Sequence, residues 1–187
     1  MHHHDIPVAR GRDPLASQFR LVPDVIARRL RRAGILLNRD ECRTPMQWSS
    51  GPNAGFAPPA ATPWLAPHAN RAEVNVAAQS HDPRSILSCY RALLALRRRS
   101  LALQAGSLEL LDLPGLPPSV VSYRRVYGEG DRAEVVEVRL NVSPREVLVD
   151  LPALRGRTAW STLRGPIDAD VSRLTLGAYE GVVALQG

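Results

Sequence analysis

The chain has 187 residues, of which 44% are apolar and 22% are charged, and its formal net charge is +6. This length suits one ordinary hydrophobic core or two small ones. The sequence contains no run of 18 apolar residues and no recognisable signal peptide at its start. We therefore expect no membrane partner, and we expect the cytoplasm as the compartment.

The positive net charge of the chain would fit a nucleic-acid binder, but the type and distribution of its basic residues do not. All 24 basic residues are arginines, a bias that GC-rich coding DNA explains more simply than selection for phosphate binding. The densest clusters, at 28–32 and 97–99, fall on predicted helices, where charge runs usually form a solvated face. No basic stripe is interleaved with aromatic residues. We expect no nucleic-acid partner and keep a small basic nucleic-acid binder as the least favoured alternative.

The first 100 residues predict two helices separated by a long loop. Residues 6–22 are expected to be irregular. Helical spacing of apolar residues then predicts a helix from Pro23 to about Arg32, which Gly34 ends. Residues 35–82 are rich in proline and lack periodicity, and a loop of that length usually serves a function or is disordered.

The second helix is predicted to begin at Asp82 and Pro83 and to run to Arg99. Its predicted apolar stripe consists of Ile86, Cys89, Tyr90, Leu93 and Leu96.

From Leu101 onward the pattern indicates β-structure. Alternating and β-branched residues predict about seven short strands, and residues 127–131 have the composition of a hairpin turn. Such spacing favours an antiparallel β-sandwich. The predicted strands are Ser107–Leu113, Val120–Val126, Ala133–Val142, Arg145–Leu151, Thr158–Leu163, Arg173–Leu176 and Val182–Leu185.

The segment from Asn38 to Phe56 carries the most specific motif. It reads RTPMQW at 43–48 and NAGF at 53–56. Both blocks resemble the signature of α-glucosidases in glycoside hydrolase family 13. Further blocks follow in that family's order, namely PWL at 63–65, EVNVAAQ at 73–79, DPRSIL at 82–87, LTL at 174–176 and AYEGVV at 178–183.

The resemblance implies a fold and a place within it. Enzymes of this family consist of a (β/α)8 barrel followed by a small β domain, and this chain resembles their C-terminal portion. The implied fold is an α+β fragment: residues 1–101 form the end of the barrel, with its rim loop and last helix, and residues 102–187 form an antiparallel β-sandwich domain. The family's three catalytic carboxylates lie upstream of the RTPMQW block, so we expect no catalytic residue in this chain and no activity from it alone.

The resemblance also implies substrate-binding residues. An arginine in the position of Arg43 lies at the mouth of the sugar pocket, where a guanidinium offers fixed donors to hydroxyl groups. Gln47 and Trp48 are expected to shape the rim, with Met46 and Trp48 anchoring the loop by burial. Ser49 stands where the family usually has aspartate, which removes a charge. The implied partner of the intact enzyme is an oligosaccharide or another α-glucoside, and no cofactor is implied.

The acidic residues present do not form a substitute catalytic pair. A retaining glycosidase needs two carboxylates about 5 Å apart. Asp40 and Glu41 are neighbours in a loop, Asp168 and Asp170 flank a turn, and the odd spacing of Glu134 and Glu137 places them on opposite faces of a strand.

The remaining candidates are weaker. Cys42 and Cys89 are expected to be reduced, buried thiols. Residues 2–5, three histidines and an aspartate, could hold a metal, but we expect none because a chain terminus is usually mobile. The main alternative to the glucosidase fragment is a non-catalytic β module that binds carbohydrate or supports a partner.

Overall fold

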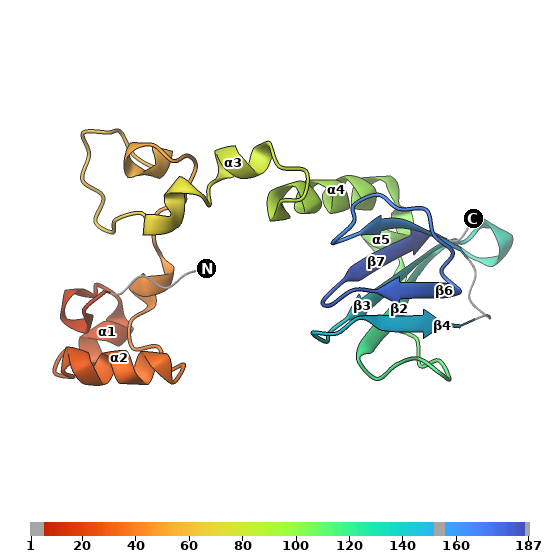
Figure 1. Cartoon of the computed structure of the whole chain (residues 1–187), viewed down its shortest axis with the longest axis horizontal. Helices are drawn as coiled ribbons and strands as arrows, with labels where there is room; N and C mark the ends of the chain where they lie inside the picture. The colour runs from red at the N-terminus through yellow and green to blue at the C-terminus, as the bar shows by residue number, and fades with distance from the viewer. Residues whose placement is uncertain (1–5, 152–155, 186–187) are drawn as a thin grey trace. The chain divides into compact units, whose positions relative to one another are not determined.

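The computed structural model describes residues 6–151 and 156–185, and these form two compact units, Met1–His81 and Asp82–Gly187 (Figure 1). His2, His3, His4 and Asp5 lie outside the described residues. The two compact units are defined by contacts between residues and meet between His81 and Asp82. The boundary predicted near residue 102 is of another kind, because it separates the part of the sequence that resembles a barrel from the part that resembles a β domain. That boundary stays a prediction.

The first unit contains helices α1 (Pro14–Gln18) and α2 (Asp24–Arg32) around a small core. This core consists of Val8, Ala16, Ala27 and Leu37. The predicted helix at 23–32 is confirmed as α2, and Gly34 follows it with a φ of 83°, the left-handed conformation that glycine adopts at low cost. The region expected to be irregular contains α1, because Asp13 caps the Leu15 amide and Pro14 opens the first turn.

The long loop is folded into short turns. They are 3-10 helices η2 (Arg39–Cys42), η3 (Pro52–Gly55) and η4 (Ala69–Ala72), and helix α3 (Val76–Ser80). A further 3-10 helix, η1 (Val8–Arg10), precedes α1.

The second unit begins with helices α4 (Ile86–Arg99) and α5 (Leu101–Ala105). The predicted start of the first of these was too early. Ser85 caps α4 by accepting a hydrogen bond from the Ser88 amide, whereas Asp82 accepts one from the Arg84 amide in the preceding turn. Helix α5 was expected to be β-structure. Its first two amides donate to the Glu134 carboxylate of a strand far along the chain, a contact that no local pattern shows.

Two antiparallel sheets make up the rest of this unit (Figure 1). A five-stranded sheet has the order β1-β2-β3-β7-β5, and a two-stranded sheet pairs β4 with β6. The strands lie close to the predicted positions: β1 Ser107–Leu110, β2 Val120–Tyr127, β3 Glu134–Asn141, β4 Val147–Asp150, β5 Arg157–Ser161, β6 Arg173–Leu176 and β7 Gly181–Leu185. The predicted hairpin turn is confirmed between β2 and β3, where Gly130–Arg132 form the 3-10 helix η5.

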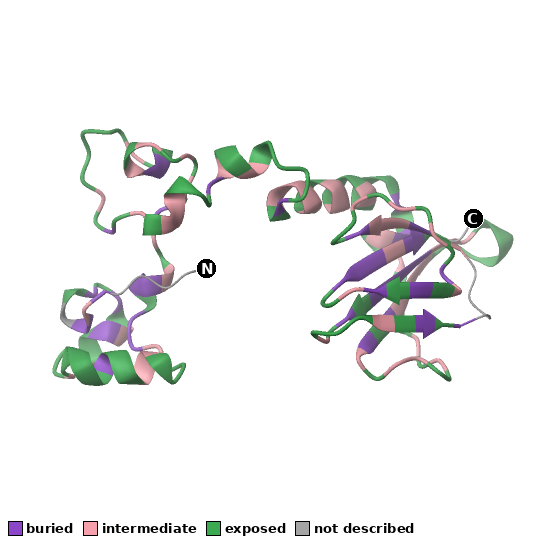
Figure 2. Ribbon diagram, in the orientation of Figure 1, coloured by how far each residue is buried: buried purple, intermediate pink, exposed green. Residues whose placement is uncertain are grey.

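The two sheets share one hydrophobic core. Figure 2 shows buried residues concentrated on these strands. The core joins residues of the five-stranded sheet to residues of β4, β6 and nearby loops: Val120, Val149, Leu151, Val171, Leu174, Leu176, Val182 and Ala184. The opposite face of the five-stranded sheet bears Tyr123, Val138 and Val183, which are in register with one another.

Candidate functional site

The Gln47-Trp48 pair of the predicted site is bonded to a segment almost 30 positions later. The amide of Val76 donates to the Gln47 carbonyl at 2.9 Å, and the amide of Ala77 donates to the Trp48 carbonyl at 3.0 Å. The Gln47 side chain also donates through Nε2 to the Val74 carbonyl. These three bonds hold the backbone of the motif in a fixed position. The side-chain amide of Gln47 is used in one of them and therefore has a structural contact.

A left-handed turn follows the motif and closes back on it. Asn53, Ala54 and Gly55 have φ values of 48°, 53° and 67°. The Ala54 carbonyl accepts the amides of both Trp48, at 2.8 Å, and Ser49, at 3.0 Å. Because Ala54 is fully buried, the turn is packed as well as hydrogen-bonded. Two consecutive non-glycine residues in this conformation are uncommon and costly, a pattern that marks functional loops.

Arg43 precedes this turn and has an exposed guanidinium. Its Nη1 lies 3.7 Å from Asp40 Oδ1, and about half of its side chain is exposed. Asp40 itself is buried and accepts the amides of Arg12, at 2.7 Å, and Asp13, at 3.0 Å. The Arg43 amide also donates to the Asp40 carbonyl at 2.9 Å, so the backbone of Arg43 is held in place while guanidinium donors remain available to a ligand.

The structure does not link the three predicted substrate-binding residues, Arg43, Gln47 and Trp48, to one another. Within residues 6–151 and 156–185, no hydrogen bond or ion pair connects Arg43 to Gln47 or to Trp48. The prediction that Met46 and Trp48 anchor the loop by burial was wrong, because each is 52% exposed. The backbone bonds of Trp48 hold the loop instead, and its ring is left facing solvent. The substrate-binding role of Arg43, Gln47 and Trp48 stays a prediction.

Sequence reasoning missed one residue near the loop. The Arg12 guanidinium lies over the Trp64 ring, 4.8 Å from its centroid, in a cation–π contact. These residues are 52 positions apart, and Arg12 belongs to a stretch without a motif. Only the folded chain brings them together.

The buried acidic residues of the first unit, Asp13, Asp40 and Glu41, are occupied by structural contacts. Asp13 accepts two guanidinium hydrogen bonds from Arg39, and these bonds hold the pKa of its carboxyl well below the usual range. Glu41 accepts two from Arg31, at 2.7 and 2.5 Å. The lowered pKa makes Asp13 a poor proton donor, and both oxygens of Glu41 are engaged by Arg31, so neither residue is placed to supply the acid that glycoside hydrolysis needs.

The cysteines are both thiols, as expected, but each is half-buried rather than buried. Among the residues that the structure describes, no cluster of three metal-ligating side chains occurs. Within the same residues, no helix has the length and apolar content needed to cross a bilayer.

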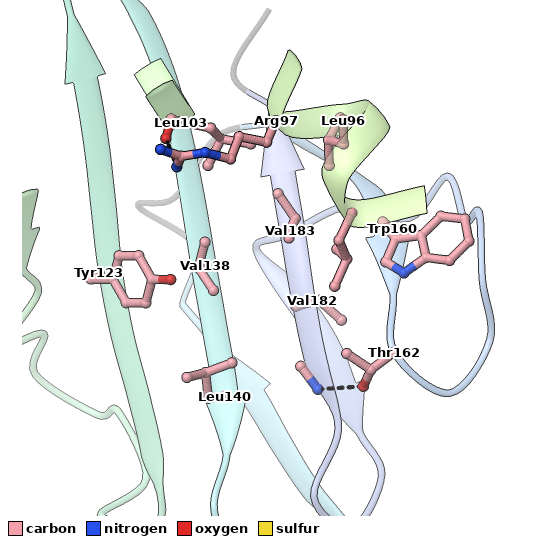
Figure 3. A pocket seen from close by; sticks show the side chains of 12 residues that line it. Leu96, Arg97, Leu103, Tyr123, Val138, Leu140, Trp160, Thr162, Val182 and Val183 are labelled. Atoms are coloured by element: carbon pink, nitrogen blue, oxygen red, sulfur yellow. Dashed lines mark hydrogen bonds between the residues drawn. The ribbon is translucent and has the colours of Figure 1, made fainter. Parts of the chain in front are cut away.

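A separate pocket lies in the second unit, between α4, α5 and the five-stranded sheet (Figure 3). Its volume is about 260 Å³. Figure 3 shows Tyr123, Val138 and Val183 on the sheet with Leu96 beside them on the helix. The lining is mainly apolar, and its Thr162 hydroxyl accepts the Gly181 amide at 2.9 Å. This pocket offers apolar contact but few of the polar groups that recognise a sugar.

Comparison with protein families decides what the first part of the chain is. Residues 23–106 match the family model "Alpha amylase, catalytic domain", and this range includes the Arg43–Phe56 loop. The segment belongs to the α-amylase family. The resemblance to family 13 α-glucosidases that the motifs predicted is thereby confirmed.

Curated relatives of this α-amylase-family segment include glucosidases. The probable oligo-1,6-glucosidase 2 of Bacillus subtilis (strain 168) is 37% identical over 126 residues, which are 67% of this chain and 21% of that protein. The oligo-1,6-glucosidase of Heyndrickxia coagulans is 32% identical over 145 residues, or 78% of this chain and 24% of that protein. The chain therefore spans about a fifth to a quarter of the curated relatives it matches.

Solved structures of the same family resemble the fold. A mutant of the trehalulose synthase MutB, in complex with Tris, is 26% identical, with a TM-score of 0.73 over 96% of this chain and 32% of that one. The trehalulose synthase MutB of Pseudomonas mesoacidophila MX-45 is 24% identical, with a TM-score of 0.74 over 99% of this chain and 33% of that one. At that identity the second match supports the fold alone. The mixed helical and antiparallel-sheet fold is thus that of α-amylase-family enzymes, of which the chain spans a third.

Proposed function

We propose that this chain is the C-terminal part of a retaining α-glucosidase that hydrolyses terminal α-linked glucose from oligosaccharides. In this proposal residues 1–101 supply the rim loop and last helix of a (β/α)8 barrel, and residues 102–187 form a β-sandwich domain. The proposed compartment is the cytoplasm, and no cofactor is required. The observation that carries the proposal is the match of residues 23–106 to the α-amylase catalytic domain, because it includes the complete RTPMQW loop.

Each site residue has a proposed role that follows from its contacts. Arg43 donates hydrogen bonds to sugar hydroxyls, since its guanidinium is half-exposed while Asp40 holds one side of it. Trp48 presents an exposed aromatic face to the apolar face of a sugar ring. Gln47 shapes the rim through its bond to Val74 rather than by contacting sugar directly.

The proposal places the reacting carboxylates in the rest of the enzyme. Hydrolysis with retention requires a nucleophile and an acid/base about 5 Å apart. The buried acids near the loop, Asp13, Asp40 and Glu41, are already engaged by arginines or backbone amides. We therefore propose that the isolated chain is inactive.

A non-catalytic β module is the second candidate, and one observation favours it. The two sheets of the second unit share a core of their own, so this unit has the packing of an independent domain. Such a module would bind oligosaccharide without any catalytic partner. Calorimetric titration of the purified chain with isomaltose and maltotriose tests it, and saturable binding that survives Arg43→Ala would favour the module over the glucosidase fragment.

The decisive test of the glucosidase proposal is a chimera. The matching segment of the Bacillus subtilis relative is replaced by this chain, and hydrolysis of an aryl α-glucoside is measured. We expect a folded, active chimera, no hydrolysis by this chain alone, and a loss of about 10- to 100-fold in kcat/KM for Arg43→Ala, as for a lost hydrogen bond to a charged donor. Arg145→Ala, an exposed arginine of the second unit, is the matched control and should leave kcat/KM unchanged. A chimera that melts cooperatively but hydrolyses nothing would overturn the proposal.

A further inference from the structure

Trp64 is held in place by its surroundings although its ring is half-exposed. The Arg12 guanidinium lies over the ring, 4.8 Å from its centroid. The side-chain amide of Asn53 donates to the carbonyls of Pro58 and Ala61, both at 2.8 Å, and so fixes the segment that leads into Trp64. The side chain is nevertheless 47% exposed. A large aromatic residue that is fixed but exposed is available for a contact with a ligand.

A series of contacts leads from Trp64 to Arg43, the arginine proposed to bind sugar. Arg12, which covers the Trp64 ring, donates its amide to Asp40 Oδ2 at 2.7 Å. The other oxygen of Asp40 lies 3.7 Å from Arg43 Nη1. All four residues belong to the first compact unit. The ring of Trp64 and the guanidinium of Arg43 are therefore positioned from the same buried carboxylate.

The surroundings of the Trp64 ring suit a sugar better than an apolar protein surface. Figure 2 shows the loop between η3 and η4 largely exposed, and Arg12 is exposed as well. Packing an apolar surface onto the ring would also remove water from this guanidinium, which is costly. An oligosaccharide offers an apolar ring face with hydroxyl groups around it. The indole face can cover the first, and a stacked arginine keeps fixed donors for the second.

We propose that Trp64 is a second sugar contact, on which a glucose unit of an oligosaccharide stacks while Arg43 holds another unit of the same molecule. Arg12 is a positioning residue that keeps the indole ring in place. This inference deepens the proposed function and rests on it for the nature of the ligand. Its consequence is a preference for substrates that have several glucose units, because a single unit cannot use both contacts.

The chimera with the Bacillus subtilis relative tests this preference. Values of kcat/KM are measured with α-glucosyl fluoride, which has one sugar ring, and with isomaltotriose, which has three. We expect Trp64→Ala to lower kcat/KM about 3- to 10-fold for isomaltotriose and to leave the value for the fluoride unchanged. Trp64→Phe keeps an aromatic face and should retain most of the activity on isomaltotriose. Arg12→Met, which removes the cation but keeps the stem, should give a smaller loss on the same substrate.

The matched control is Tyr127→Ala, which removes an aromatic side chain that is 42% exposed in the second unit. It should leave both values unchanged. The contact is overturned if Trp64→Ala lowers kcat/KM equally for both substrates, if it causes no loss with isomaltotriose, or if Tyr127→Ala causes the same loss. Melting temperatures confirm that each variant is folded, so that a loss on one substrate alone reports on binding.

Calorimetric titration with isomaltotriose, of the chimera and of this chain alone, separates the contact from catalysis. We expect Trp64→Ala to weaken binding about 3- to 10-fold and Tyr127→Ala to leave it unchanged. Binding that depends on Trp64 in a chimera that hydrolyses nothing would keep the contact and count against the glucosidase proposal. Binding by neither protein, or equally tight binding by Trp64→Ala, would overturn the contact, whereas hydrolysis of the fluoride would still support the glucosidase.

Discussion

The guanidinium of Arg39 holds the carboxylate of Asp13 in a two-pronged ion pair, with both nitrogen–oxygen distances at 2.7 Å. The amide of Arg39 adds a third hydrogen bond to the same carboxylate at 3.0 Å. Asp13 also caps the Leu15 amide at the start of α1. One buried side chain thus connects the N-terminal segment to the turn that immediately precedes Arg43. The position of the candidate site depends on this connection.

Asp13→Asn should loosen the first unit and change its response to pH. The pKa of Asp13 is lowered from 3.8, chiefly by the Arg39 hydrogen bonds, so the pair stabilises the fold fully above about pH 4 and loses its effect as the pH falls below that value. We therefore expect the variant to have a lower urea midpoint at pH 7 and a smaller difference from the parent at pH 3. Fluorescence of Trp48 and Trp64, in a chain with Trp160→Phe, reports on this unit.

The control for that experiment is Asp24→Asn, which alters an exposed carboxylate in the first turn of α2. It should change stability only by the small helix-dipole contribution, about 0.5 kcal/mol. If Asp13→Asn has the same midpoint as the parent at pH 7, or the same difference from it at both pH values, the pair does not stabilise the unit as argued.

Ala54 should tolerate glycine but not valine. Its φ of 53° costs about 1 kcal/mol for a residue with a Cβ, and a β-branched side chain is a genuine outlier there. Ala54→Val should lower the hydrogen-exchange protection of the Trp48 and Ser49 amides at least about tenfold, because both donate to the Ala54 carbonyl. Ala54→Gly should preserve that protection, and Ala61→Val, at an exposed position, should have no effect. Unchanged protection in Ala54→Val would show that the turn is not strained.

Local sequence patterns predicted the helices and strands of this fold more successfully than they predicted the contacts within the candidate site. Helix α2 and the strands could be predicted because periodicity and Gly34 are local signals. The start of α4 was placed too early because Asp82 and Ser85 are both good capping residues, and only the hydrogen bonds distinguish them. The cation–π contact of Arg12 with Trp64 joins distant positions, so no local pattern could reveal it.

The ion pair of Glu137 and Arg139 lies in the core between the sheets. A double-mutant cycle should show that the two residues are strongly coupled. The oxygen–nitrogen distance is 2.6 Å, and Arg139 also donates to the Val171 carbonyl at 2.8 Å. Burial lowers the pKa of Arg139, while Glu137 opposes that effect. Removing only the arginine, as Arg139→Met, leaves a buried carboxylate and should cost about 3–5 kcal/mol.

Replacing both residues should be far less harmful. Glu137→Leu with Arg139→Met buries apolar groups of similar size and should recover most of the lost stability, because no uncompensated charge remains. Urea unfolding of the parent, both single variants and the double variant gives the coupling energy. The matched control is Arg173→Met, whose exposed pair with Asp150 has a separation of 3.7 Å and should contribute less than about 1 kcal/mol. Additive effects of the two core substitutions would contradict the argument.

The negative charge of Glu180 should stabilise the second unit. Burial by itself would raise its pKa, but hydrogen bonds from the Ser161 hydroxyl, the Gly177 amide and Arg164 outweigh this effect and lower the pKa. Glu180→Gln replaces one carboxylate oxygen, a hydrogen-bond acceptor, with an NH2 group. This group is a donor and would face the other donors around it. We expect a loss of about 1–3 kcal/mol at pH 7 in urea unfolding followed by Trp160 fluorescence.

The pH dependence of that loss identifies its cause. Because the folded pKa lies below the ordinary value of 4.5, the carboxylate stabilises the unit above about pH 4.5 and does so less as the pH falls. The difference between Glu180→Gln and the parent should therefore shrink at pH 3. Glu146→Gln, at an exposed position, should stay within about 0.5 kcal/mol of the parent at either pH. A Glu180→Gln loss that is equally large at pH 3 would mean that shape, and not charge, makes this residue important.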